Sequence, residues 1–406
     1  MLLSRTLRNL NPLQRWIRTH DAGPLEELER DFLPSEVLYK QFSERGFDFY
    51  AGVPDSFLKD FTGYIADNHP PNKHIITANE GTAVSVAAGY YMATRKYPIV
   101  YLQNSGLGNV INPILSLCDT RVYKIPILFL IGWRGEPGKK DEPQHLVQGK
   151  VMSNLLTDLS INYDVLPNFE EGSGASIDTA LYHLKSRGSP YAFLVRRKNF
   201  VDYDSKSQIK VDLPMSREDA IDKLTDKLSK FDIVVSTSGF ASRELSDIRH
   251  HKNQHQDQDF YCVGSSGHTS SIALGIAIAK PSKKVYCFDG DGSFLMHMGS
   301  IATNGSRQLP NFRHILLNNG CHDTVGGQPT NGFDIDFPRI AKACGYKYVA
   351  SVSTKEELDK SFNEMEQTVG SCFLEIKVAR RTRNDLGRFK GDPKDNKVNF
   401  MNFLEL

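Results

Sequence analysis

Lys284-Val-Tyr-Cys-Phe-Asp-Gly-Asp-Gly-Ser293, followed further along the chain by His314-Ile-Leu-Leu-Asn-Asn-Gly320, is the part of this sequence that decides the fold. Each stretch opens with a short apolar run, residues 284–288 and 314–317, of the kind that forms a buried strand. Between them we expect an apolar helix that reaches about Arg307. A strand, a helix and a second strand in this order predict two parallel neighbours in one sheet, whose carboxyl ends lie side by side.

The same alternation of strand and helix extends over most of the chain. Further strands are expected at residues 74–78, 99–103, 125–131 and 191–195 in the first half, and at residues 233–236, 260–263 and 372–378 in the second. Helical stretches such as residues 81–94, 268–279 and 355–369 lie between them. The expected strands are apolar throughout, which indicates burial on both faces. The pattern therefore predicts an α/β protein with two doubly wound parallel-sheet domains.

A polar segment at residues 198–214 separates the two halves. It is followed by Ser216-Arg-Glu-Asp219, which has the pattern of a capping box at the start of a helix. We therefore expect the following division: an N-terminal extension over residues 1–30, a first domain over 31–200, a linker over 201–214 and a second domain over 215–406. The linker is too short for a third, middle domain.

The composition excludes several classes of protein. Hydrophobic residues make up 40% of the chain and charged residues 24%, which is ordinary for a soluble globular protein. The net charge of +1 gives no basic field for nucleic acid. The longest apolar run, residues 125–133, is too short to cross a membrane. None of the six cysteines forms a CxxC pair, so we expect reduced, buried thiols and neither a disulfide framework nor a zinc site.

The first twenty residues differ from the rest of the chain. Arg5, Arg8, Arg15 and Arg18 all precede the first acid, Asp21, and apolar residues interleave with them. An amphipathic, acid-poor segment of this kind is typical of a transit peptide and predicts a mitochondrial protein. The alternative is an extension without a targeting role, in a cytoplasmic protein.

The residues at the two strand ends have the chemistry of a phosphate and metal site. Gly290 and Gly292 allow a phosphate to approach the backbone closely, and the helix that follows offers free N–H groups to an anion. Asp291 supplies a carboxylate oxygen and Asn319 an amide oxygen, both of which suit Mg²⁺. A lone Gly-Asp-Gly segment would indicate only a surface turn. The two segments together, each at a strand end, predict a site for a magnesium-bound diphosphate.

Glu80 is the candidate acid of the first half. It lies between an expected strand at residues 74–78 and a helix of small residues at 81–94. In the simpler interpretation, Glu80 only stabilises the positive end of that helix, which is worth under about 1 kcal/mol. Its position at the end of a strand also places it where a ligand of the sheet would bind.

Together these features resemble the thiamine-diphosphate enzyme superfamily, whose signature is a Gly-Asp-Gly segment followed one helix later by Asn-Asn. The resemblance implies that Asp291, Asn319 and the backbone carbonyl of Cys321 bind Mg²⁺, and that Glu80 activates the pyrimidine ring of the cofactor. It implies that the cofactor is bound by these residues and by a further set, namely Gly264, Ser265, His268, Gly290, Gly292 and Ser293. Two subunits usually share each cofactor in this superfamily, which implies a homodimer or a higher homo-oligomer with active sites between subunits.

Further segments resemble the phosphonopyruvate decarboxylase family, and through it the sulfopyruvate decarboxylases. They cover about residues 35–406 and include Gly52-Val-Pro-Asp-Ser56, Gly132-Trp-Arg-Gly135, Asp141-Glu-Pro-Gln-His145 and His322-Asp-Thr-Val-Gly-Gly-Gln-Pro-Thr330. The resemblance implies decarboxylation of a small 2-oxoacid, 3-phosphonopyruvate, to phosphonoacetaldehyde and CO₂ in phosphonate biosynthesis. It suggests a proton-transfer set, Asp55, His322 and Asp323, and a substrate set, Arg134, His145 and Gln328. For each of these side chains an ordinary structural hydrogen bond is the alternative.

Other functions stay open on the sequence alone. Sulfopyruvate decarboxylases use the same machinery on a sulfonate, and a carboligase would add a second acceptor site. Ser266 stands where the superfamily usually has a bulky apolar residue that supports the cofactor, which leaves a non-catalytic cofactor-binding protein as a further alternative. A nicotinamide dehydrogenase is disfavoured because no expected strand is followed by GxGxxG.

Overall fold

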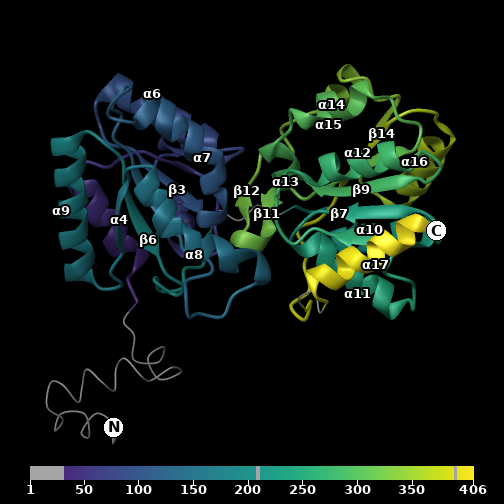
Figure 1. Ribbon diagram of the computed structural model, residues 1–406, viewed down its shortest axis with the longest axis horizontal. Helices are drawn as coiled ribbons and strands as arrows, with labels where there is room; N and C mark the ends of the chain where they lie inside the picture. The colour runs from purple at the N-terminus through teal and green to yellow at the C-terminus, as the bar shows by residue number, and fades with distance from the viewer. Residues whose placement is uncertain (1–31, 207–210, 388–390) are drawn as a thin grey trace, which may run out of the picture.

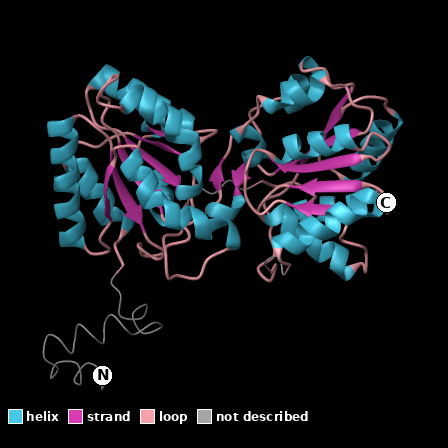
Figure 2. Cartoon of the chain, in the orientation of Figure 1, coloured by secondary structure: helices cyan, strands magenta, loops and turns pink. Residues whose placement is uncertain are grey.

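The structure is a computed structural model that describes residues 32–206, 211–387 and 391–406 (Figure 1). The segment on which mitochondrial targeting was predicted lies outside the described residues, so targeting stays a prediction. Within the described ranges, no helix is both long and apolar enough to cross a membrane. The chain forms two lobes that lie side by side, and each has strands at its centre and helices around them (Figure 2).

The first lobe is built on a parallel sheet with the strand order β2-β1-β3-β4-β6-β5. Its strands are β1 (Tyr50–Gly52), β2 (His74–Ile76), β3 (Ile99–Gln103), β4 (Leu128–Gly132), β5 (Asn162–Val165) and β6 (Tyr191–Val195). Its helices are α4 (Ser35–Glu44), α5 (Lys59–Asn68), α6 (Glu80–Thr94), α7 (Leu107–Pro113), α8 (Pro143–Asp158) and α9 (Glu170–Arg187). Because β2 and β3 flank β1 on opposite sides, the sheet has its topological switch point between β1 and β3.

The second lobe repeats this plan with the strand order β13-β14-β10-β9-β7-β8, again all parallel. Its strands are β7 (Ile233–Ser236), β8 (Asp259–Tyr261), β9 (Val285–Gly290), β10 (Phe312–Asn318), β13 (Tyr348–Val352) and β14 (Cys372–Lys377). Its helices are α10 (Arg217–Lys227), α11 (Phe240–His251), α12 (Thr269–Ala279), α13 (Asp291–Met296), α14 (Ser300–Ser306), α15 (Phe337–Ala343), α16 (Lys355–Gln367) and α17 (Pro393–Glu405). A short antiparallel hairpin, β11 (Cys321–His322) and β12 (Gln328–Pro329), follows β10. The switch point of this sheet lies between β7 and β9.

The central strands are buried on both faces, as their apolar sequences predict. In β3, Val100 and Leu102 belong to the hydrophobic cluster on one face of the first sheet, whereas Ile99 and Tyr101 belong to the cluster on the other face. The residues of β9 alternate in the same way between two clusters of the second lobe. The described residues between β6 and α10 form no middle domain. The predicted fold class, two doubly wound parallel-sheet domains, is therefore confirmed.

The structure departs from the sequence prediction at three places. The helix expected to reach Arg307 is two short helices, α13 and α14, because His297 leaves the helical conformation (φ −135°, ψ 42°) and its ring stacks on that of His268. The edge strands β5 and β13 are partly exposed, so they lack the continuous apolar run of a buried strand. The strands of the hairpin have two residues each, too few for any periodic signal.

The two lobes meet through segments that follow the carboxyl ends of their strands. The side-chain amide of Gln328, in the hairpin, donates to the hydroxyl of Thr62 on α5 (2.9 Å), and this contact is buried. The side-chain amide of Asn79, which precedes α6, donates to the backbone carbonyl of Met296 at the end of α13 (3.1 Å). The hairpin lies at the junction of the lobes in Figure 1. Within one chain, the ligand-binding edges of both sheets therefore face each other.

Candidate active site

Asp291 lies directly after β9, and its residue is 2% exposed. Its Oδ1 accepts a hydrogen bond from the backbone N–H of Asn319 (3.3 Å), and its Oδ2 accepts one from the hydroxyl of Thr330. The two strands that carry Asp291 and Asn319 are hydrogen-bonded neighbours. The structure thus brings together the acidic and the amide-bearing segments, and it adds Thr330, which was not among the residues predicted for this site.

The carboxylate of Asp291 has no lysine, arginine or histidine within ion-pair distance in the part of the chain that the structure describes. Burial raises the pKa of Asp291 to about 6, against the opposing effect of its hydrogen bonds. Because an unpaired buried negative charge is costly, this environment fits a site that a divalent cation completes. Asn319 is 4% exposed, and its Oδ1 accepts only a 3.2 Å bond from the N–H of Cys321, so a lone pair is left for a metal.

Glycines allow close packing on one side of Asp291 and leave room on the other. A Cβ atom at Gly332 would lie 2.7 Å from Oδ2 of Asp291, and one at Gly292 would lie 2.8 Å from Nδ1 of His322. At Gly290 the nearest atom to such a Cβ is Cγ2 of Thr237, at 3.8 Å. The backbone at Gly290 is therefore the open side of this loop, where a phosphate can approach.

Ser293 links the loops that follow β7, β8 and β9 at this edge of the second sheet. Its Oγ accepts a hydrogen bond from the backbone N–H of Gly267 (2.8 Å) and one from the hydroxyl of Thr237 (3.0 Å). Ser265 adopts a left-handed conformation (φ 53°), so the segment from Gly264 to His268 turns sharply beside Ser293. The two loops that carry predicted cofactor residues are thus in contact through Gly267 and Ser293, and Thr237 is an addition that the sequence did not single out.

Glu80 is the first residue of α6 and is 4% exposed. Its Oε2 accepts a hydrogen bond from the side-chain amide of Asn109 on α7 (2.7 Å). A Cβ atom at position 106 would lie 2.3 Å from Oε1, so only the glycine found there, Gly106, fits beside the carboxylate. Burial raises the pKa of Glu80, because the charged form of a carboxyl group is less stable away from water. Asn79 caps the N-terminal end of α6, because its Oδ1 accepts a hydrogen bond from the backbone N–H of Thr82. Glu80 is therefore not needed as the cap.

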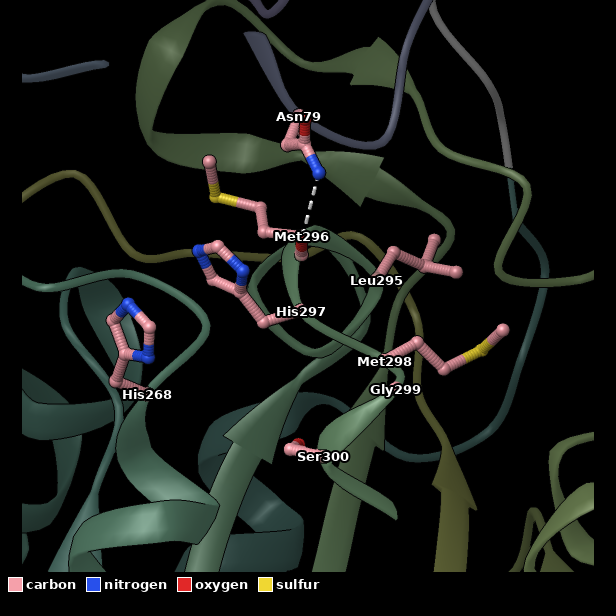
Figure 3. Close-up of a pocket in the computed structure, with 8 residues that line it drawn as sticks. All are labelled: Asn79, His268, Leu295, Met296, His297, Met298, Gly299 and Ser300. Atoms are coloured by element: carbon pink, nitrogen blue, oxygen red, sulfur yellow. Dashed lines mark hydrogen bonds between the residues drawn. The ribbon is translucent and has the colours of Figure 1, made fainter. Parts of the chain in front are cut away.

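A cavity of about 500 Å³ lies next to these residues (Figure 3). It is lined by Asn79, His268, Leu295, Met296, His297, Met298, Gly299 and Ser300. The rings of His268 and His297 stack along one wall, with centroids 4.3 Å apart. The cavity therefore opens between Asn79, which precedes Glu80, and His268, which ends the turn that begins at Gly264. The resemblance predicts cofactor contacts at both places.

Asp55 follows β1 and is completely buried. Its Oδ2 accepts from the backbone N–H of Phe57 (2.9 Å), whereas its Oδ1 has no hydrogen-bond partner among the described residues. Gly132 at the end of β4 gives it space, since a Cβ there would lie 2.0 Å from Oδ2. Burial raises the pKa of Asp55 to about 6. A buried carboxyl that titrates near neutral pH and keeps a free oxygen suits proton transfer.

Arg134 lies beside Asp55, but its guanidinium is already paired with another acid. Its guanidinium forms a two-point contact with Asp141, in which Nε donates to Oδ2 (2.8 Å). A third nitrogen donates to the hydroxyl of Ser56 (3.2 Å). The structure therefore places Arg134 at the predicted edge and shows a paired side chain there.

His322 and Asp323, the other members of the proton-transfer set, have different surroundings. Burial lowers the pKa of His322 to about 4, so its imidazole is neutral at pH 7. Asp323 accepts hydrogen bonds from the hydroxyl of Thr382 (2.9 Å), from Nε of Arg380 (3.3 Å) and from Arg217 (3.4 Å). Asp323 therefore ties the hairpin to α10 and to the chain after β14, which suits a positioning role better than proton transfer.

The two remaining substrate candidates lie at the junction of the lobes. Gln328 is 6% exposed and bonded to Thr62, as described above. His145 is 9% exposed, contacts Gln148 on its own helix, and has its pKa lowered by burial. Its neighbour Gln144 reaches the second lobe, with side-chain carbons 3.7 Å from the Cβ position of Gly264. Both residues are thus close to the cofactor edge; Oε1 of Gln328 has no hydrogen-bond partner among the described residues, whereas the ring of His145 contacts Gln148.

Comparisons with known proteins match both lobes. The family model for the N-terminal binding domain of thiamine pyrophosphate enzymes matches residues 34–155, and that for the C-terminal binding domain matches residues 238–376. A phosphonopyruvate decarboxylase from Streptomyces viridochromogenes is 31% identical over 87% of this chain and 90% of its own, and one from Streptomyces hygroscopicus is 32% identical over 87% and 89%. A sulfopyruvate decarboxylase from Methanosarcina acetivorans is 27% identical over 84% of this chain and 90% of its own.

Proposed function

This chain belongs to the phosphonopyruvate decarboxylase family of thiamine pyrophosphate enzymes, and from that premise we propose that it converts 3-phosphonopyruvate to phosphonoacetaldehyde and CO₂. The chain is a decarboxylase by family. The identity of its 2-oxoacid is the proposal. It is supported by the identity to the two Streptomyces enzymes, which is higher than that to the sulfopyruvate decarboxylase.

One observation carries the cofactor site that this reaction needs: a buried carboxylate at Asp291, with no cationic partner among the described residues, lies beside Asn319 at the end of two neighbouring strands. We propose that Asp291, Asn319 and the backbone carbonyl of Cys321 hold Mg²⁺, and that the open backbone at Gly290 receives the diphosphate. Thiamine diphosphate, when bound, supplies the nucleophilic carbon and the electron sink that loss of CO₂ from a 2-oxoacid requires.

The chain's own residues supply the proton positions. Glu80 provides one such position, as a buried carboxyl group fixed by Asn109 at the edge that faces the second lobe. Asp55 keeps one free oxygen in a buried site and is our candidate for moving a proton to the product. Asp323 fixes the hairpin that carries His322. The closely packed junction around Gln328 and Thr62 excludes water from one side of the site.

A CO₂-release assay tests the proposed reaction. Purified protein with thiamine diphosphate and Mg²⁺ is given phosphonopyruvate, sulfopyruvate or pyruvate at equal concentrations. We expect kcat/KM for phosphonopyruvate to exceed that for pyruvate by roughly 100-fold or more, because a site built to bind a distal acid rejects a substrate that lacks it. A preference for sulfopyruvate would replace the proposal by the sulfonate reaction, and no CO₂ from any of the three would contradict a decarboxylase.

We also propose that the protein is a homodimer or a higher homo-oligomer. Apart from Glu80, neither α6 nor α12 carries a charged residue. Each helix nevertheless reaches the surface, where Met92 is 64% exposed and Ile278 is 55% exposed. A helix that is apolar on all sides is normally covered, and a second copy of this chain would cover both.

The same resemblance predicts that two chains contribute to each site, although one chain supplies both edges in the structure. Mixing two inactive variants tests this prediction. Chains with Glu80→Gln and chains with Asp291→Ala are unfolded, mixed in equal amounts and refolded. Shared sites restore about one quarter of the wild-type activity, since half of the dimers are mixed and each has one intact site. Wild-type chains carried through the same procedure control for refolding, and a mixture without activity beside an active control contradicts the prediction.

A further inference from the structure

Arg243 is a half-buried arginine on the first turn of α11, and no acidic side chain pairs with it in the described part of the chain. Burial lowers the pKa of its guanidinium, and no carboxylate offsets this effect. Its Cζ lies 5.5 Å from the ring centre of Phe240, one turn earlier on the same helix. The first turn of α11 has no acidic residue. Arg243 is thus a charged group, partly removed from water, whose five N–H donors are available to a ligand.

The other arginines of this region differ from Arg243 in having acidic partners. Arg217 contacts the same ring of Phe240 (5.4 Å to the ring centre) and donates two hydrogen bonds to Glu244 (2.8 and 2.9 Å). Arg380 is bonded to Asp323 (3.3 Å). These ion pairs fix Phe240 and the helix around Arg243 without using its charge.

The position of α11 places Arg243 at the ligand crevice of the second sheet. α11 follows β7 and α13 follows β9, and the switch point lies between these two strands. The two helices pack on opposite faces: Leu245 of α11 belongs to the cluster with Phe288, whereas Phe294 of α13 belongs to the cluster with Cys287. A ligand at the ends of β7 and β9 therefore lies between the start of α11 and Asp291.

Two contacts connect the start of α11 to the proposed site. The hydroxyl of Thr237, at the end of β7, donates to Oγ of Ser293 in the phosphate loop (3.0 Å). Gly239 lies against the hairpin, since a Cβ there would be 3.0 Å from Cγ2 of Thr324. The start of α11 therefore lies next to both the phosphate loop and the hairpin, and Arg243 is on the helical turn that follows.

We propose that Arg243 binds the phosphonate group of the substrate, at the end opposite to the carboxylate that leaves as CO₂. This inference rests on the proposed function. A guanidinium matches a phosphonate through two parallel N–H···O bonds, and such charge-assisted bonds are the strong ones. The proposed diphosphate site already has a metal ion and the backbone at Gly290, so the guanidinium of Arg243 is left for a second anion.

Binding of an unreactive probe tests Arg243 independently of turnover. The probe is 3-phosphonopropionate, which has both acidic groups but no keto carbon, and it is titrated by calorimetry into protein loaded with thiamine diphosphate and Mg²⁺. For Arg243→Gln we expect Kd for the probe to rise about 10- to 100-fold, as for the loss of one charge-assisted hydrogen-bond pair. Arg243→Lys should recover part of the affinity, and Kd for propionate should not change.

Two controls keep the outcomes separate. Arg339→Gln changes an exposed arginine of the same lobe and should leave the affinity for the probe unaltered. Kd for thiamine diphosphate is measured for each variant, and an equal loss there would assign Arg243 to the cofactor and overturn the proposal. Unchanged affinity of Arg243→Gln for the probe would also overturn it. If the probe binds through Arg243 but phosphonopyruvate releases no CO₂, the proposed reaction fails and the assignment of Arg243 stands.

Discussion

Replacing Glu80 by glutamine is expected to lower kcat by about 10³-fold while the protein still binds thiamine diphosphate. The amide has the same size, so it fits between Asn109 and Gly106, where the carboxylate now lies. It cannot exchange a proton with a ligand, however. Burial already raises the pKa of Glu80, which makes proton uptake by the native carboxylate easier than in water, and this capacity is what the variant loses. Steady-state CO₂ release and calorimetric titration of the cofactor measure the two effects separately.

Glu171→Gln is the matched control for this prediction. Glu171 also lies in the first turn of a helix, α9, but it is exposed and distant in sequence from the site. Both substitutions remove the same stabilisation of a helix dipole, which is under about 1 kcal/mol. If Glu80 served only its helix, the two variants would behave alike. Near-normal turnover of Glu80→Gln would therefore refute a catalytic role.

Replacing Asp291 by alanine is expected to abolish the dependence of cofactor binding on Mg²⁺. Removing a metal ligand outright should weaken the binding of thiamine diphosphate by at least about 100-fold, since even supporting groups around a metal contribute 10- to 100-fold to metal affinity. The loss has a direct physical cause, because no other described side chain can replace the carboxylate between Asn319 and Thr330. The measurement is calorimetry with and without Mg²⁺, together with the shift in Tm that cofactor and metal produce.

Asp291→Asn separates this effect from damage to the fold. The amide keeps the shape of the side chain and removes a buried negative charge, so the cofactor-free protein should not lose stability. Asp334→Ala, at an exposed position in the neighbouring loop, controls for the removal of an acid as such. Unchanged cofactor affinity of Asp291→Ala in Mg²⁺ would exclude this residue from the metal site.

How much of the site could be predicted from the sequence depends on the kind of contact. Asp291 and Asn319 follow neighbouring strands, and a strand–helix–strand unit fixes that neighbourhood locally, so their meeting was predictable. The contact of Asn109 with Glu80 was not predictable, because the helix that brings Asn109 there comes from another part of the first lobe. Thr330 reaches Asp291 only after the chain has turned back through a hairpin too short to predict.

The roles of charged residues changed most between sequence and structure. Arg134 stands at the predicted edge, but its two-point contact with Asp141 takes up the charge that a substrate would need. Asp323 follows a motif histidine, yet it is bound by Thr382, Arg380 and Arg217. Arg243 has no motif of its own and stands out only because it lacks such a partner in the described chain.

The sequence by itself determined the two parallel sheets and the residues at their strand ends. Strands that are apolar throughout can only be buried on both faces, and the polar residues that follow such strands must collect at one edge. Only the tertiary structure decided which of these side chains keep a free charge or a free oxygen, which helix is interrupted at His297, and which loops of the two lobes meet. The reason is that pairing of charges and contact between lobes join residues far apart in the chain, and no local pattern records which partner each residue finds.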